Sequence, residues 1–512
     1  MDLDRLARIQ EEEAWKAAYD EEIGKLEMTF QELTLLQYEL TTEKIESPRL
    51  TEIQQAHFQI FTDPRFTEML DFWEQKISDP KWKRRLAVLK NKALQEEIES
   101  HPAIASIKNA LMSTILQKTF TLHGETYSLS NVQAYLMMNP DRQLREDLFM
   151  ETVRYGKETA SQFRELVLAR NRYAQEKGYS TYFHFVFEHI YGLDWEMYRE
   201  QGMQMLQQTD AISRAWDSRF KEKFGWEDVR YHDLLFGALN YYDLPAEAFP
   251  SEKINEVLAL TFASFGVELS STPIQVALCD LPYGGMMNAI SPTDIRIAVR
   301  KRDGYGAYKI ALHEMGHALY EHFSSQQPPE LFRFKDLIGH EAMAEIFMTI
   351  SAQPKWLQDV FHVEDSAIKQ IQEYDHLFFL IVTKYYFYQS LLEHAIYENP
   401  EADFQELSDK WAEEVFGVKG RAMSPSVDVL YLAYPVYTHS YIFADGIRDM
   451  LRKAFRVDGL YGNQHIFDAI RQSFMEPSES DPWQEKIQAL CKEPFTFQYF
   501  AEYLAGKSRF QC

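Results

Sequence analysis

The sequence contains little cysteine. Only Cys279, Cys491 and Cys512 occur among 512 residues, an odd number without the spacing of a metal site or a disulfide framework. The N-terminal stretch also lacks the apolar core of a secretory signal, and no run approaches the roughly 18 apolar residues that span a membrane. We therefore expect no disulfides, no membrane segment and a location in a reducing cytoplasm.

Positive charge is also scarce. Lysine and arginine total 53 against 78 acidic residues, which gives a formal net charge of -25. Such a surface repels nucleic-acid phosphates and anionic lipids, so neither is expected as the main partner. The acidic excess needs no specific partner, because it also keeps a globular protein in solution.

Glycine and proline are few, at 21 and 19 residues, while hydrophobic residues make up 46%. Apolar residues recur at three- and four-residue spacing over most of the chain, as in 163–178, which predicts a mainly α fold. One small β-sheet is expected over 272–299, where β-branched and apolar residues cluster between turn signals. We expect an N-terminal helical part at 1–270, a catalytic core at 271–450 and a C-terminal helical part at 451–512.

A helix predicted over 308–323 carries the sequence His313-Glu314-Met315-Gly316-His317. Two histidines four residues apart lie on one face of a helix, so both imidazoles can bind one metal ion. Glu314 projects beside them, where a carboxylate can take a proton from water. The pattern predicts one zinc ion per chain, held by His313 and His317, with Glu314 as the catalytic base.

A third ligand is expected from a second helix that begins near Gly339. This helix offers Glu341 and Glu345 one turn apart. We expect Glu341 to bind the metal and Glu345 to accept the other N–H of a ligating imidazole, although these roles can be exchanged. Glu330, which follows two prolines, is a weaker candidate, and His322 faces away from His313 on its helix.

The motifs HEMGHALYE at 313–321 and HEAMAE at 340–345 resemble those of the helical gluzincin peptidases. This group includes thimet oligopeptidase, oligoendopeptidase F, angiotensin-converting enzyme and the carboxypeptidase Taq family. The first motif is similar to carboxypeptidase Taq, and the second is closer to angiotensin-converting enzyme. The resemblance implies a two-lobed helical shell around a deep cleft, with Glu341 as third ligand and Glu345 supporting a histidine.

The segment YPVYTHSYIFADGI at 434–447 resembles the tyrosine-bearing segment of the same families. This implies that Tyr437 donates a hydrogen bond to the oxyanion of the reaction, with Tyr434, His439 and Tyr441 as alternatives. An extended peptide is expected to pair with the sheet near Gly284, Gly285 and Met286. Tyr441 is a further candidate for substrate binding.

The resemblance implies hydrolysis of peptide bonds in short peptides, by an oligopeptidase. Carboxypeptidase or dipeptidyl carboxypeptidase action is the alternative within the same class, with Lys309, Lys419 and Arg421 as candidate anchors for a terminal carboxylate. A catalytically inactive helical scaffold that binds peptides is the alternative from another class. The sequence does not predict an oligomeric state.

Overall fold

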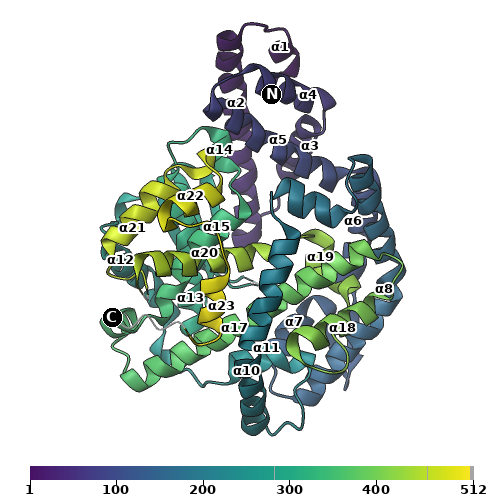
Figure 1. Cartoon of the computed structure of the whole chain (residues 1–512), viewed down its shortest axis with the longest axis vertical. Helices are drawn as coiled ribbons and strands as arrows, with labels where there is room; N and C mark the ends of the chain where they lie inside the picture. The colour runs from purple at the N-terminus through teal and green to yellow at the C-terminus, as the bar shows by residue number, and fades with distance from the viewer. Residues whose placement is uncertain (282, 458, 508–512) are drawn as a thin grey trace.

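The computed structural model describes residues 1–281, 283–457 and 459–507. About 72% of the structure is helical, with two small sheets, which confirms the predicted mainly α fold (Figure 1). Over the described ranges, no helix has both the length and the apolar composition needed to cross a lipid bilayer. Cys279 and Cys491 are free thiols, and Cys512 lies outside the described residues.

The first half of the chain is built almost entirely of helices, many of which begin at a proline in the first turn, where the missing N–H costs no hydrogen bond. Its α-helices are α1 (Leu3–Ala7), α2 (Glu12–Glu43), α3 (Pro48–Phe61), α4 (Pro64–Lys76), α5 (Pro80–Ser100), α6 (Pro102–Gln117), α7 (Leu129–Met138), α8 (Arg142–Glu176), α9 (Tyr182–His184), α10 (Trp195–Phe224), α11 (Tyr231–Asn240) and α12 (Ile254–Ala263). A π-helix, η1 (Phe185–Ile190), follows α9, and 3₁₀ turns occur at η2 (Ala246–Ala248), η3 (Ser251–Lys253) and η4 (Leu269–Ser271).

The second half carries the predicted metal motif and the tyrosine segment. Its α-helices are α13 (Tyr305–Phe323), α14 (Pro329–Arg333), α15 (Leu337–Met348), α16 (Pro354–Phe361), α17 (Asp365–Glu398), α18 (Phe404–Phe416), α19 (Val429–Ala433), α20 (His439–Phe455), α21 (Gln464–Ile470), α22 (Trp483–Cys491) and α23 (Gln498–Leu504). The remaining turns are η5 (Thr349–Ala352), η6 (Pro425–Val427), the π-helical η7 (Arg471–Met475) and η8 (Ser478–Ser480).

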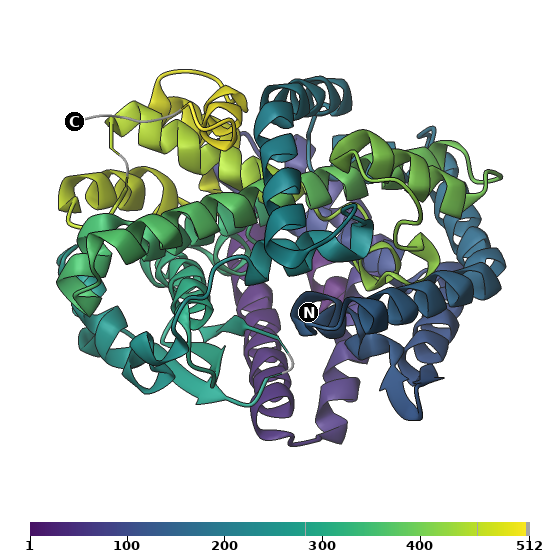
Figure 2. The ribbon, with the colours of Figure 1, turned by 90° about the horizontal axis from the view of Figure 1, so that it is seen from below.

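The predicted sheet is present and has three strands, β3 (Ile274–Cys279), β4 (Gly285–Ser291) and β5 (Asp294–Arg300), in the order β3-β5-β4. β5 is central, parallel to β3 and antiparallel to β4. Helix α13 packs against β4 and β5, and α2 lies along β4 (Figure 2). The sheet therefore supports the helix that carries the predicted metal motif.

Sequence reasoning missed a second, two-stranded sheet formed by β1 (Thr119–Leu122) and β2 (Glu125–Ser128). The strands are only four residues long, and His123 and Gly124 connect them, both with positive φ. Two residues in the left-handed region form the turn that matches strand twist in a hairpin. Strands this short give too little alternation to stand out from the surrounding helical pattern.

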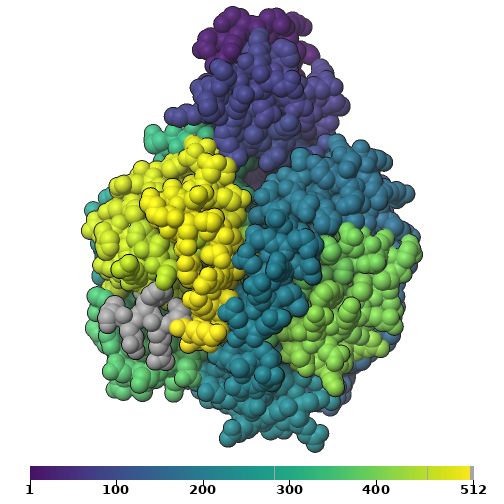
Figure 3. Space-filling model, in the orientation of Figure 1, coloured from purple at the N-terminus to yellow at the C-terminus, as the bar shows by residue number. Residues whose placement is uncertain are grey.

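The first five helices have a hydrophobic core of their own. Its buried residues run from Leu6 to Ala93, whereas the main core extends from Ile98 to Leu504. In Figure 3 these N-terminal residues project from one end of the molecule. The main core is continuous across residues 270 and 450, where the domain boundaries were expected. These boundaries stay predictions, as do the two lobes around a cleft.

Buried ion pairs join the N-terminal helices to the main body. Glu330 in α14 is fully buried, accepts a hydrogen bond from Tyr19 at 2.9 Å and pairs with Arg85 at 2.9 Å. Arg333 at the end of α14 pairs with Glu27 of α2 and donates to the carbonyl of Ala289 in β4. Glu330, the weaker candidate for a metal ligand, thus has a partner in this interface instead.

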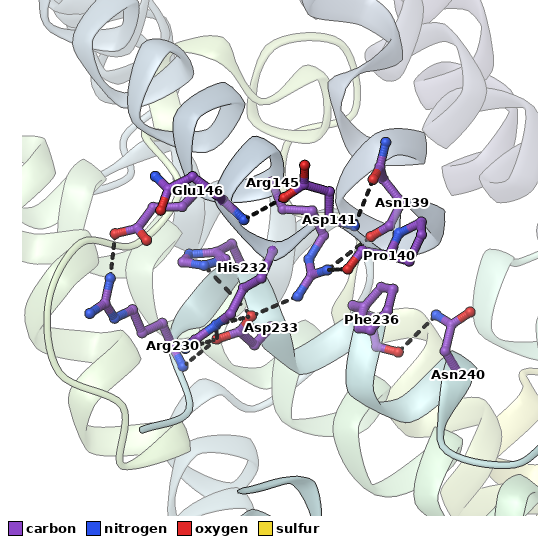
Figure 4. A network of polar contacts seen from close by, with 12 residues as sticks. Asn139, Pro140, Asp141, Arg145, Glu146, Arg230, His232, Asp233, Phe236 and Asn240 are labelled. Atoms are coloured by element: carbon purple, nitrogen blue, oxygen red, sulfur yellow. Dashed lines mark hydrogen bonds and ion pairs between the residues drawn. The ribbon is translucent and has the colours of Figure 1, made fainter. Parts of the chain in front are cut away.

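A buried acid joins α8 to α11 (Figure 4). Asp233 is fully buried and pairs with Arg145 at 2.9 Å and with Arg142 at 2.6 Å. The Arg230 N–H also donates to this carboxylate at 3.1 Å, which caps the start of α11. Asp233 is therefore the carboxylate that neutralises buried Arg145, and it shares Arg142 with Asp228.

Substitution of Asp233 by Asn is expected to lower the thermal unfolding midpoint by several degrees. The change leaves Arg145 buried without its anion, and breaking one partner of a buried ion pair costs about 3–5 kcal/mol. Asp228→Asn is the matched control, because Asp228 pairs with the same Arg142 but is half exposed. Circular dichroism measures both; equal midpoints for the two variants would contradict this role.

Candidate metal centre

The site begins with the close contact between α13 and α15. A Cβ atom built on Gly316 would lie 2.5 Å from the Met343 carbonyl oxygen and 2.7 Å from the Ala344 Cα. These are backbone atoms, so they cannot move aside as a flexible side chain can. Glycine at this position therefore allows the two helices to approach closely enough for side chains of α15 to reach the histidines of α13.

Three potential ligands converge at this contact. Ligand atoms of His313, His317 and Glu341 all lie within 4.8 Å of one another. The Glu341 Oε2 atom is 3.6 Å from His313 Nε2 and 3.8 Å from His317 Nε2. Ligands about 2.0–2.1 Å from a tetrahedral zinc ion are about 3.3–3.5 Å apart. The separations of 3.6 and 3.8 Å are slightly longer than the edges of such a tetrahedron.

The protonation states at this site follow from burial. Burial lowers the pKa of His313 to about 3 and that of His317 well below its usual value, with neighbouring histidines adding to both effects. Burial also raises the pKa of Glu341 to about 8. Neutral imidazoles are the form that binds metal. The raised pKa of Glu341 indicates that its burial is not offset by a nearby positive charge.

Glu314 lies beside this group on α13 and is 8% exposed. Burial raises its pKa to about 8, and the charge on Glu341 contributes further. A Cβ atom built on Gly285 of β4 would lie 3.2 Å from Glu314 Cγ, so the Glu314 side chain lies against the strand. The Glu314 side chain therefore lies on the side of α13 that faces β4.

Glu345, one turn after Glu341 on α15, lies behind the first histidine. Its Oε1 atom is 3.6 Å from His313 Nδ1, the nitrogen that faces away from Glu341. On its other side, Glu345 is 3.9 Å from Arg448, which also pairs with Asp445 and Asp449. A carboxylate at this position can orient the His313 ring, as second ligand-sphere carboxylates do in metal sites.

Sequence reasoning assigned no role to His340, the residue before Glu341. Its ring stacks on His317 with centroids 4.1 Å apart and planes 21° apart. The His340 Nε2 atom is 3.2 Å from Glu321, which also accepts a hydrogen bond from Lys335 at 2.6 Å. His340 thus fixes the orientation of the His317 ring by packing. The repeated His-Glu pair at 313–314 and 340–341 was the available signal.

The tyrosine segment reaches the same place. The Tyr437 hydroxyl donates to Glu341 Oε1 at 3.4 Å and lies 3.4 Å from the Tyr441 hydroxyl. Burial raises the pKa of Tyr437 above its usual value, so the phenol stays protonated at neutral pH. The preceding Val436 has a positive φ of 56°, and its N–H donates to buried Glu393 at 2.9 Å. This contact holds the turn that directs Tyr437 toward Glu341.

The other candidates of this segment are placed differently. Tyr434 is 56% exposed, with its ring 5.9 Å from that of Tyr437. His439 is buried, and its ring packs against the aromatic rings of Phe187 and Tyr191. Tyr441 stacks on Tyr386 with centroids 4.7 Å apart. Tyr437 is the member whose hydroxyl contacts a predicted ligand.

The predicted substrate strand borders the site. The Arg300 N–H donates to the Gly284 carbonyl at 2.8 Å, and β4 runs antiparallel to β5 from this point. The alternation of such a ladder directs the backbone groups of Gly285 and Met287 away from β5. The side chain of Ile310 fills the space that a side chain at residue 284 would need. The two glycines thus allow β4 to lie directly against α13.

The residues present fit a zinc ion. The donor set is two imidazoles and one carboxylate, which suits zinc better than magnesium or calcium. Among the described residues, the buried Oε2 atom of Glu341 has no hydrogen-bond partner, although it faces both Nε2 atoms. A divalent cation would provide that partner and would balance the buried carboxylates.

Replacement of Gly316 by Ala is expected to weaken zinc binding by about tenfold or more and to lower the unfolding midpoint. The added methyl group forces α13 and α15 apart, and overpacking costs about 1–3 kcal/mol. Gly306→Ala is the control, since the same helix offers open space there. Zinc titration of both variants gives the result. Unchanged zinc affinity in Gly316→Ala would show that the ligand set does not depend on the close approach of α13 to α15.

No protein-family model matches this chain, and no curated protein matches it. The resemblance to the helical gluzincins therefore concerns only the motifs at 313–321, 340–345 and 434–447.

Proposed function

We propose that this chain is a zinc-dependent peptidase that cleaves short peptides. The observation that carries the proposal is the position of Glu314 next to the convergent His313, His317 and Glu341. Within the described ranges this group has three members, so the protein supplies three ligands and leaves a fourth position for water or substrate. A structural zinc site usually has four protein ligands and needs no base.

His313, His317 and Glu341 would hold the ion at the contact between α13 and α15. Zinc, when bound, lowers the pKa of a water molecule and polarises a carbonyl group. Glu345 would keep the His313 ring in its orientation through Nδ1, and His340 would do so for His317 by stacking. The burial of all these groups strengthens the electrostatic interactions among them.

Glu314 would act as general base and then as general acid. Its carboxylate takes a proton from the attacking water and returns that proton to the leaving amine of the cleaved peptide. Electron pairs move from the water oxygen to the carbonyl carbon and, on collapse, to the amine nitrogen. A raised pKa suits this double role, because the group must both accept and release a proton near neutral pH.

Tyr437 would stabilise the negative charge that develops on the substrate oxygen. Its hydroxyl lies against Glu341, and its raised pKa keeps it a hydrogen-bond donor at neutral pH. The Tyr441 hydroxyl shares a hydrogen bond with the Tyr437 hydroxyl, and this bond limits rotation of the Tyr437 hydroxyl. The positive φ of Val436 and its bond to Glu393 support this placement.

An extended peptide would be held by β4. The backbone N–H and C=O groups of Gly285 and Met287 face away from β5, so they do not hydrogen-bond to that strand. A substrate segment that pairs there would be extended beside Glu314. Recognition through the backbone tolerates many peptide sequences, which is the property that an oligopeptidase needs.

Two candidate anchors for a terminal carboxylate are already paired with acidic side chains, which favours cleavage within peptides over carboxypeptidase action. Lys309 is buried and pairs with Asp375 at 2.5 Å, and Arg421 pairs with Asp409 at 2.7 Å. Both charges are therefore already compensated by acids of the protein. Lys419 is exposed in the segment after α18 and has no contact that relates it to the site.

Replacement of Glu314 by Gln is expected to lower hydrolysis of an internally quenched peptide library by about 10²–10⁴-fold, while zinc stays bound. The amide keeps the size of the side chain but cannot accept the proton. Glu330→Gln is the control for loss of a buried carboxylate outside the ligand group, because Glu330 pairs with Arg85 at the N-terminal helices. Metal analysis accompanies the kinetic assay.

Two outcomes of this experiment contradict parts of the proposal. Full activity in Glu314→Gln would exclude Glu314 as the base. A wild-type protein that holds zinc but cuts no peptide would favour the inactive peptide-binding scaffold. Cleavage of peptides amidated at the C-terminus by the wild type would support endopeptidase action, and a strict need for a free carboxylate would support a carboxypeptidase.

Replacement of Tyr437 by Phe is expected to reduce kcat by about 10²–10³-fold with little change in KM or zinc content. The ring remains, so only the hydroxyl donor to the developing charge is lost. Tyr434→Phe serves as the control because Tyr434 is largely exposed nearby. Equal kcat values for the two variants would remove Tyr437 from the reaction.

A further inference from the structure

A second group of histidine and carboxylate side chains lies outside the centre at α13 and α15. Ligand atoms of His184, His394 and Glu398 all lie within 4.8 Å of one another. His184 is the last residue of α9, whereas His394 and Glu398 are four residues apart near the end of α17. Sequence patterns did not indicate this group, because His184 is more than 200 residues before the other two members.

The spacing of the group suits a metal ion. His394 and Glu398 are one turn apart, so both side chains extend from the same face of α17. His184 Nε2 is 3.5 Å from Glu398 Oε1, which is long for a hydrogen bond but equal to the distance between two ligands of a tetrahedral zinc ion, about 3.3–3.5 Å. An ion between these atoms would account for the separation.

The two imidazoles are arranged like those of the first centre. The rings of His184 and His394 have centroids 5.4 Å apart and planes at 84°. The rings of His313 and His317 have centroids 4.8 Å apart and planes at 88°. In both pairs, nearly perpendicular rings bring one nitrogen of each close to the same carboxylate. The second pair reaches this geometry from two different helices.

Aromatic neighbours fix the position of His394. Its ring stacks on Trp195 with centroids 4.3 Å apart, and the ring of Phe183 meets it edge-on at 5.1 Å. Among the described residues, neither nitrogen of His394 has a hydrogen-bond partner. A histidine held rigidly by packing, with free nitrogens directed at another histidine and a carboxylate, needs little reorganisation to bind a metal.

A further carboxylate supports His184. Glu188, one turn later, lies 3.1 Å from His184 Nδ1, while the opposite nitrogen faces Glu398. This is the arrangement in which a carboxylate orients a metal-bound imidazole through its second nitrogen. Glu188 belongs to η1, and a π-helical turn of this kind is often found at functional sites.

We propose that His184, His394 and Glu398 form a second site for a divalent transition-metal ion, with zinc as the best match for two imidazoles and one carboxylate. The site is partly exposed, so water completes the coordination. The ion would connect the α9–η1 segment to the end of α17 and stabilise the contact between them. This site is independent of the proposed peptidase activity, because none of its residues belongs to the first centre.

Zinc titration by calorimetry tests the second site on chelator-treated protein. Wild type is expected to bind two ions per chain, whereas His184→Asn combined with Glu398→Gln is expected to bind one. Both substituted positions are partly exposed, so the packing of His394 against Trp195 is retained. His189→Asn is the matched control, since His189 lies in η1, directly after α9, but outside the group, and this variant should still bind two ions.

A variant of the first centre separates this proposal from the peptidase proposal. His317→Gln is expected to keep one zinc ion, and addition of zinc should raise its unfolding midpoint. His317→Gln combined with the His184 and Glu398 substitutions should bind none and show no rise. Equal zinc binding by wild type and the His184, Glu398 variant would overturn the second site and identify the group as a histidine–carboxylate ion pair without metal.

Discussion

The close approach of α13 and α15 is the constraint on which the rest of the site depends. Gly316 lies opposite the backbone of Met343 and Ala344, so two helices meet without an intervening side chain. One helix brings two histidines and a carboxylate, and the other brings Glu341 and Glu345. α15 also packs against α20, which contains the second part of the tyrosine segment. A wider separation of α13 and α15 would take the third ligand out of reach.

The electrostatics of this region suit the proposed cation. Glu314, Glu341 and Glu345 are each less than one-tenth exposed, and burial raises the pKa of all three. Arg448 lies 3.9 Å from Glu345 but pairs more closely with Asp445 and Asp449. The protein's own cations therefore leave the carboxylates near His313 uncompensated. A divalent ion would stabilise their ionised form and use the neutral imidazoles beside them.

Local patterns predicted the parts of the structure that depend on neighbouring residues. The helical periodicity, the small sheet at 274–300 and the shared face of His313 and His317 all follow from spacings within one element. Glu341 was expected as the third ligand because a second helix offers two glutamates one turn apart, and the resemblance to known motifs implied the same choice. The stacking of His340 on His317 was not predicted, although it involves the residue next to Glu341.

Several contacts between distant segments were not predicted. The β1–β2 hairpin is too short for a clear alternation, and the bond from Val436 to Glu393 depends on a turn with positive φ. The role of Glu330 is another example. Its two preceding prolines indicated a loop, but the carboxylate is buried against Arg85 and Tyr19 of the N-terminal helices. Such partners are set by the tertiary fold, on which a single sequence carries little information.

The most direct test of the metal centre is an anomalous difference map at the zinc edge from crystals of the full chain grown with zinc. The arrangement of α13 and α15 predicts a peak about 2.0–2.2 Å from His313 Nε2, His317 Nε2 and an oxygen of Glu341, with Glu314 beside it but not bound. Crystals that hold zinc elsewhere and show no peak among these three residues would contradict the assignment of this contact as a metal centre.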